Sequence, residues 1–167
     1  MTETLSPVLP DEVDRAARAL LEAACDKELR IATAESCTGG LLASLLTDVA
    51  GASHAFERGF VTYSDEAKSE LLGIPLELIA REGAVSAAVA CAMAEGALRA
   101  SRADIALSVT GFAGRGGPDD EPGLVHFGCA RRGRATAHHE AHFGDIGRGA
   151  VRVECLRTGL AMLAEAL

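Results

Sequence analysis

Two short glycine-rich segments, each placed directly after an apolar run, constrain the fold of this chain more than any other feature. The first, residues 35–40 (Glu-Ser-Cys-Thr-Gly-Gly), follows the apolar run 30–34 and precedes leucines that recur at helical spacing. The second, residues 110–118, follows the apolar run 105–109. Short apolar runs that end in glycine-rich turns are typical of buried strands. Strands that alternate with helices in this way predict an α/β fold.

The other periodic segments extend this alternation along the chain. Further helices are expected from Asp11, from Asp65 to a stop at Gly73, from Ser86 to residue 97 and through residues 151–163. Further strands are expected at residues 60–63, 123–130 and 136–143. The last two strands are neighbours in sequence, which favours an antiparallel pair. We therefore predict a three-layer α/β/α sandwich with a mixed, mostly parallel sheet.

Length and charge limit the domain count and the partners. A chain of 167 residues with 49% hydrophobic content suits one core, so we expect a loose tail over residues 1–10 and a single domain over residues 11–167. The formal charge is −8, and no run of basic residues of the nucleic-acid-binding kind interrupts it. Nucleic acid is therefore not an expected partner, whereas a small phosphate-bearing ligand remains compatible with a few local cations.

Cysteine usage and the amino-terminal segment bear on the cell compartment. The five cysteines are scattered, with neither a CxxC pair nor the dense spacing of a secreted disulfide scaffold. The amino-terminal segment carries acidic residues and prolines before its apolar run, unlike a signal peptide, and no segment resembles a membrane span. We expect reduced thiols, a cytoplasmic location and no membrane partner.

Both glycine-rich turns follow strands at the edge where open α/β sheets bind ligands, so they are expected to face one pocket. Neither turn matches GxGxxG or GxxxxGK[ST], which leaves an anion cradle of another kind or a turn that carries a nucleophile. Ser36 stands at the strand-to-helix turn and is a candidate nucleophile, with N–H groups at the start of the following helix placed to stabilise an oxyanion. The alternative is that Ser36 only caps the helix.

A serine nucleophile requires a base, and lysine fits better than histidine. The histidines lie in a loop or on late strands, and a metal pair at His138 and His142 has no cysteine or carboxylate at ligand spacing, so no metal is expected. Lys68 lies on a predicted helix and would need desolvation to act as a base; otherwise it is a solvated surface lysine. The Tyr63 hydroxyl, five residues earlier, is either a proton relay or part of the core.

Residues 34–40, 61–68, 83–86 and 109–114, taken together and in this order, resemble the CinA C-terminal family from about residue 11 to the end. The resemblance implies a stand-alone amidohydrolase that acts on nicotinamide mononucleotide in pyridine-nucleotide salvage. It implies Ser36 as the nucleophile, Lys68 as the base and Tyr63 as an assisting hydroxyl, with no cofactor. It also implies that turn amides near Thr38 and Gly39 stabilise the oxyanion. Two alternatives stay open: a serine-lysine amidase for another small substrate, and a non-catalytic nucleotide-binding module.

The resemblance also implies a set of substrate contacts. They are Thr38, Gly39 and Gly40 in the first turn, Thr110, Gly111, Ala113 and Gly114 in the second, and Arg148 as a phosphate ligand. The chain departs from the family pattern where Arg115 replaces a usual proline and where two residues are inserted after Asp145. Arg131, Arg132 and Arg134 are expected in a solvated hairpin. Alanine-rich helices favour a homo-oligomer.

Overall fold

A five-stranded mixed sheet lies at the centre of the protein, in a computed structural model that describes residues 9–167. Its strands are β1 (Ile31–Glu35), β2 (Phe56–Val61), β3 (Ile105–Gly111), β4 (Leu124–Arg131) and β5 (Ala137–His142), in the order β2-β1-β3-β4-β5. β1 pairs in parallel with β2 and β3, and the β3-β4 and β4-β5 pairs are antiparallel. Most of the predicted tail, residues 1–8, lies outside the described residues.

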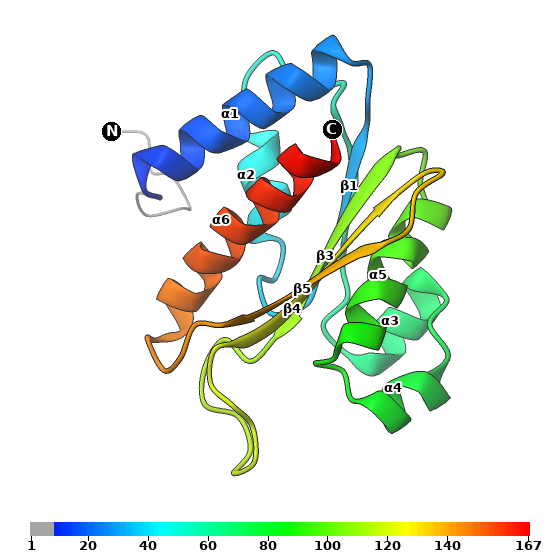
Figure 1. Ribbon diagram of the computed structural model, residues 1–167, viewed down its shortest axis with the longest axis vertical. Coiled ribbons are helices and arrows are strands. Elements are labelled where there is room, and N and C mark those ends of the chain that lie inside the picture. Colours follow the sequence, from blue (N-terminus) through cyan, green and yellow to red (C-terminus); the bar gives the residue numbers. More distant parts are fainter. Residues whose placement is uncertain (1–8) are drawn as a thin grey trace.

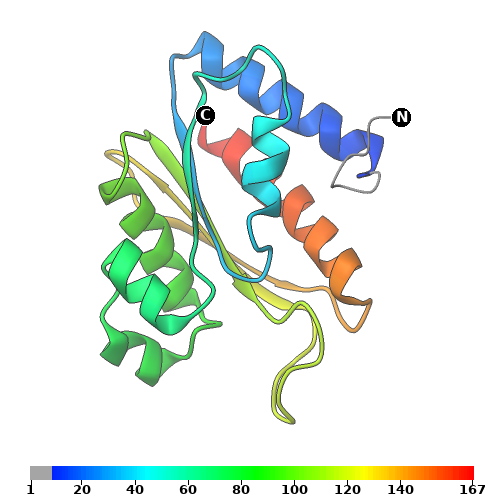
Figure 2. The same ribbon diagram turned by 180° about the vertical axis from the view of Figure 1, so that it is seen from behind.

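Helices cover both faces of the sheet and form the outer layers (Figure 1). One layer holds α1 (Asp11–Asp26), α2 (Leu41–Thr47) and α6 (Arg148–Ala166). The other holds α3 (Asp65–Leu72), α4 (Leu76–Glu82) and α5 (Ala87–Arg99), and the two layers are also separate from behind (Figure 2). The predicted three-layer α/β/α sandwich is confirmed. Within residues 9–167, no helix has both the length and the apolar composition that a membrane crossing requires.

Two apolar clusters, one on each side of the sheet, make up the core. The larger joins the α1, α2 and α6 layer to the sheet and includes Leu42, Phe127 and Leu156. The smaller lies under α3, α4 and α5 and includes Val89 and Met93. Full burial of side chains of this size contributes about 1.5–3 kcal/mol each, so the sheet is fixed from both faces.

The structure corrects two predicted boundaries. β2 runs over Phe56–Val61 and not over residues 60–63, because its parallel pairing with β1 begins where Phe56 meets Ile31 and ends where Val61 meets Glu35. Ser64, not Asp65, caps α3, since its hydroxyl accepts a hydrogen bond from the Ala67 amide at 3.0 Å. The short helix α4 was not predicted; it begins after Pro75, an extended N-cap residue whose carbonyl accepts the Leu78 amide at 3.0 Å and the Ile79 amide at 3.3 Å.

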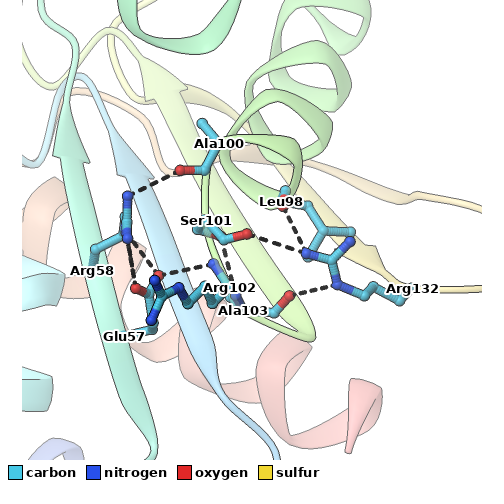
Figure 3. A network of polar contacts seen from close by, with 8 residues as sticks. All are labelled: Glu57, Arg58, Leu98, Ala100, Ser101, Arg102, Ala103 and Arg132. Atoms are coloured by element: carbon cyan, nitrogen blue, oxygen red, sulfur yellow. Dashed lines mark hydrogen bonds and ion pairs between the residues drawn. The ribbon is translucent and has the colours of Figure 1, made fainter.

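A polar network holds the end of the sheet opposite the glycine-rich turns (Figure 3). Glu57 pairs with Arg58 at 2.8 Å and accepts the Arg102 amide at 3.2 Å. Arg132 lies exposed in the hairpin between β4 and β5, as expected, and its guanidinium donates to carbonyl oxygens at the carboxyl end of α5 and in the loop after it. These are the carbonyls of Leu98, Ser101 and Ala103. The prediction of a solvated hairpin is therefore confirmed for Arg132, and the end of α5 supplies carbonyls that its donors satisfy.

Candidate active site

Ser36 and Lys68 meet at the carboxyl end of β1, as the sequence predicted. Ser36 is the first residue after β1, and its amide donates to the Val109 carbonyl of β3 at 3.0 Å. Lys68 lies on α3, and its Nζ stands 3.2 Å from Ser36 Oγ. The alternative of a solvated surface lysine is excluded, because the Lys68 side chain is 1% exposed.

The surroundings of Lys68 suit a neutral amine. Besides Ser36, its Nζ contacts only two carbonyl oxygens within residues 9–167, those of Thr62 at 3.0 Å and Tyr63 at 3.1 Å. A neutral amine has two N–H donors for these carbonyls and a lone pair that can accept the Ser36 hydroxyl proton. Burial lowers the pKa of the Lys68 ammonium, while the charges of Asp65 and Cys37 oppose this shift. The geometry and the direction of the pKa shift both favour a base.

Tyr63 contacts this pair through its backbone, not through its ring. Its carbonyl accepts from Lys68, whereas its side chain is 72% exposed. The hydroxyl has no hydrogen-bond partner within the described part of the chain. The proposed relay through the hydroxyl thus stays a prediction, and the alternative of a core aromatic does not fit the exposure.

The turn that follows Ser36 is fixed by its own amides. The Gly39 amide donates to the Ser36 carbonyl at 3.1 Å, and the Leu41 amide donates to the Thr38 carbonyl at 3.1 Å. The Gly39 amide, expected near an oxyanion, is therefore already engaged inside the turn. Among residues 9–167, the amides of Cys37 and Thr38 have no hydrogen-bond partner. These two amides are the better candidates for stabilising negative charge beside Ser36.

The second glycine-rich turn lies beside the first, since Val109 pairs with Glu35. Thr110 is buried and its hydroxyl donates to the Ala84 carbonyl at 2.8 Å, which ties the loop before α5 to this edge. A Cβ on Gly111 would lie 2.6 Å from the Val125 side chain, so this glycine permits close strand packing. Ala113 is buried in the core cluster at 4% exposure.

Gly114 and Arg148 are close neighbours at the exposed end of this edge. A Cβ on Gly114 would stand 3.3 Å from a terminal guanidinium nitrogen of Arg148. Arg148 is exposed as the first residue of α6, and no carboxylate within residues 9–167 pairs with it. This cation next to a glycine turn is a suitable anion contact.

Comparison with known proteins identifies the family of this chain. Residues 13–167 match the family model described as the CinA C-terminal domain. The chain belongs to the CinA C-terminal domain family. A solved CinA relative, competence/damage inducible protein CihA from Agrobacterium tumefaciens, has 43% identity and a TM-score of 0.92, covering 96% of this chain and 98% of that one.

Other CinA relatives differ in length. Nicotinamide-nucleotide amidohydrolase PncC from Escherichia coli K12 is 43% identical over 166 residues, which is 98% of this chain and 95% of PncC. A CinA-like protein from Akkermansia muciniphila is 54% identical over 112 residues, or 66% of this chain. The chain spans only 27% of the length of that protein, and 30% of a putative competence-damage inducible protein from Caldicellulosiruptor bescii.

Two departures from the CinA pattern meet in space. Arg115, where the family usually has proline, forms an ion pair with Asp145 at 2.8 Å, directly before the inserted residues. Both side chains are largely exposed, so the pair contributes roughly 0–1 kcal/mol. The ion pair affects position more than stability, because it links the second turn to the segment that leads into Arg148.

Glu35 supports the turn that carries Ser36, a role that the sequence did not predict. Its side chain is fully buried, and its two oxygens accept the amides of Leu42 at 3.0 Å and Ala43 at 2.8 Å. The carboxylate thereby satisfies two unpaired amides at the start of α2 and fixes the helix that follows the Ser36 turn. An acidic residue directly before a serine-glycine turn was the available signal.

We predict that Glu35→Ala destabilises the CinA domain by about 2–4 kcal/mol, because two buried amides lose their acceptor and a cavity remains. Glu35→Gln keeps one carbonyl acceptor and is expected to lose less. Urea unfolding followed by circular dichroism measures both changes, with the exposed Glu66→Ala as the control. A Glu35→Ala variant as stable as the control would contradict the assigned role.

The hydrogen bonds of the histidines within residues 9–167 are to groups other than Ser36. His126, on a late strand as expected, is 6% exposed, and its Nδ1 lies 3.0 Å from His138 Nε2. Burial lowers the pKa of His126. Because His126 pairs with Thr110 across β3 and β4, it faces the α5 side at the same edge of the sheet. Residues 9–167 contain no group of three or more metal-ligating side chains with suitable geometry.

Proposed function

We propose that this chain hydrolyses the carboxamide of nicotinamide mononucleotide to nicotinic acid mononucleotide and ammonia. The observation that carries the proposal is the 3.2 Å contact between buried Lys68 Nζ and Ser36 Oγ, in a chain that belongs to the CinA C-terminal domain family. PncC is named a nicotinamide-nucleotide amidohydrolase and aligns with 98% of this chain at 43% identity. Pyridine-nucleotide salvage in the cytoplasm is the corresponding role.

The mechanism begins with neutral Lys68. Its lone pair accepts the Ser36 proton while Ser36 Oγ attacks the carboxamide carbon. The amides of Cys37 and Thr38 stabilise the oxyanion of the tetrahedral intermediate. Protonated Lys68 then gives its proton to the leaving nitrogen, and ammonia departs. Water, deprotonated by Lys68, hydrolyses the acyl-enzyme and restores Ser36. The cycle consumes one water and requires no cofactor.

The other predicted site residues have supporting roles in this proposal. The Tyr63 hydroxyl assists proton transfer if its exposed ring turns toward the bound substrate. Gly39 and Gly40 permit the turn, with φ values of +60° and +97° that other residues rarely adopt. Gly114 lets the nucleotide approach the backbone beside Arg148, and Thr110 shapes the pocket wall by holding the Ala84 carbonyl.

Arg148 is proposed to bind the phosphate of the substrate. We predict that Arg148→Met raises KM for nicotinamide mononucleotide roughly 10- to 100-fold, the equivalent of one charge-assisted hydrogen bond. The kcat/KM for nicotinamide riboside, which has no phosphate, should stay unchanged. Steady-state kinetics on both substrates test this. An equal loss on both would instead place Arg148 in the chemistry or in folding.

Release of ammonia from nicotinamide mononucleotide by the purified chain tests the function, with nicotinic acid mononucleotide confirmed by mass spectrometry. Nicotinamide riboside and free nicotinamide serve as comparison amides. Preference for the mononucleotide supports the proposal, and turnover of another amide alone would favour the broader amidase. Binding of the mononucleotide without turnover would favour a regulatory module. Size-exclusion chromatography tests the proposed homo-oligomer.

A further inference from the structure

Arg152, on α6, reaches across to the turn that carries Ser36. Its terminal nitrogen Nη2 donates to the Thr38 carbonyl, although the two residues are 114 positions apart in sequence. The same nitrogen lies 3.3 Å from the place that a Cβ on Gly39 would take. Glycine at position 39 therefore makes room for this guanidinium. The contact joins α6 directly to the turn beside the nucleophile.

The arginine completes the restraint of one peptide group, the one between Thr38 and Gly39. Its carbonyl accepts from Arg152 and from the Leu41 amide at 3.1 Å, and its N–H donates to the Ser36 carbonyl at 3.1 Å. Two successive glycines follow Thr38, and glycine backbones rotate with little steric cost. Without Arg152, the remaining contacts are backbone hydrogen bonds of the turn itself.

The burial of Arg152 is unfavourable for a residue that only packs. Its Nε is buried and has no hydrogen-bond partner within the described part of the chain. An unsatisfied buried donor costs stability, whereas an apolar side chain of similar length would fill the same space without that cost. The hydrogen bond that the guanidinium donates to the Thr38 carbonyl, rather than packing, accounts for an arginine at this position.

We propose that Arg152 is a positioning residue that fixes the Ser36 turn for catalysis. By holding the peptide between Thr38 and Gly39, it keeps the preceding amides of Cys37 and Thr38 in place for the oxyanion. Arg152 does not touch the reacting atoms in this scheme. The inference rests on the proposed amidase activity, and it adds a third element, α6, to a site built from β1 and α3.

Kinetics of Arg152→Met and Arg152→Lys test the proposal, with Arg157→Met as the matched control. Arg157 lies on the same helix and pairs on the surface with Glu12 and Glu154. For Arg152→Met we expect kcat to fall on the order of 10²-fold, the effect of a small misplacement of catalytic groups, with KM changed less than about threefold. Arg152→Lys should recover part of the loss because it retains a cationic donor.

Two further measurements separate positioning from a merely structural role. The midpoint of the pH profile of kcat/KM should not move in Arg152→Lys, because the contacts of Lys68 are unchanged. Labelling of Ser36 by an aryl sulfonyl fluoride, followed by mass spectrometry, should slow in parallel with kcat. This reaction reports on the turn without the nucleotide substrate, so a failure of the proposed function and a failure of the Arg152 proposal can be distinguished.

Each result for the Arg152 variants either supports the proposal or overturns it. Slower labelling and lower kcat in folded Arg152 variants support the proposal, and slower labelling alone supports it even if the substrate is a different amide. Wild-type labelling and turnover in folded Arg152→Met overturn it. If Arg152→Met does not fold, Arg152→Lys decides: reduced kcat with an unchanged Tm supports positioning, and wild-type kcat overturns it.

Discussion

Replacement of Ser36 by alanine is expected to abolish amide hydrolysis while the fold and substrate binding remain. Loss of a serine nucleophile typically lowers kcat by at least about 10⁴-fold, because no other group forms the acyl-enzyme. The side chain of Ser36 is small and its hydroxyl contacts Lys68 Nζ, so the stability change should stay near about 1 kcal/mol. Ammonia release and calorimetric titration with nicotinamide mononucleotide measure the two effects separately.

Ser44→Ala is the matched control for this change. Ser44 is an exposed serine on α2, the helix that follows the catalytic turn, so its loss should leave kcat unchanged. Retained turnover in Ser36→Ala would exclude a serine nucleophile and would point to a water molecule that is deprotonated by Lys68 and attacks the carboxamide carbon directly. Binding that disappears together with turnover would instead assign Ser36 to the ground-state contacts of the substrate.

The fold and the pair formed by Ser36 and Lys68 could both be predicted from the sequence. Apolar runs followed by glycine turns located β1 and β3, and parallel strands bring their carboxyl ends to one edge. This placed Ser36 and the second turn together. Lys68 followed from chemistry, since only two lysines exist and an arginine cannot act as a base. The contact between Lys68 on α3 and Ser36 at the end of β1 could be seen only in the structure.

Other features could not be predicted because their signals are weak or distant in sequence. β2 contains Glu57, Arg58 and Gly59, so its pattern lacks the alternation of a typical strand. The role of Arg152 depends on packing between α6 and a turn more than a hundred positions away, which helical spacing does not encode. The cap formed by Glu35 depends on where α2 begins in three dimensions.

The thiol beside the nucleophile is a further example of this limit. Cys37 and Cys155 were expected only to be reduced, and both are free in the structure. A hydrogen bond between them lowers the pKa of Cys37 and raises that of Cys155. Spacing gave no indication of the pair, because α6 brings Cys155 to the Ser36 turn in the same way that it brings Arg152.

The second large expected effect is the dependence of kcat/KM on pH, which is set by the protonation of Lys68. Because only the neutral amine can accept the Ser36 proton, log(kcat/KM) should rise with a slope of about one as pH increases toward the pKa of Lys68. Burial places that pKa below the ordinary 10.5, so the plateau should begin below this pH. Lys68→Met removes the lone pair and Lys68→Arg stays protonated, and both should lose at least about 10³-fold in kcat.

Stability supplies an independent check of the same pKa. Since the folded state holds the Lys68 proton less tightly than the unfolded state, the unfolded state binds more protons between the lowered pKa and 10.5. The free energy of unfolding should therefore rise with pH across this window in the wild type, and Lys68→Met should lack that contribution. Lys27→Met is the control, because Lys27 is exposed and, within residues 9–167, its ammonium bonds only the Leu167 carbonyl. A flat activity profile together with equal pH dependence of unfolding in wild type and Lys68→Met would exclude Lys68 as the base.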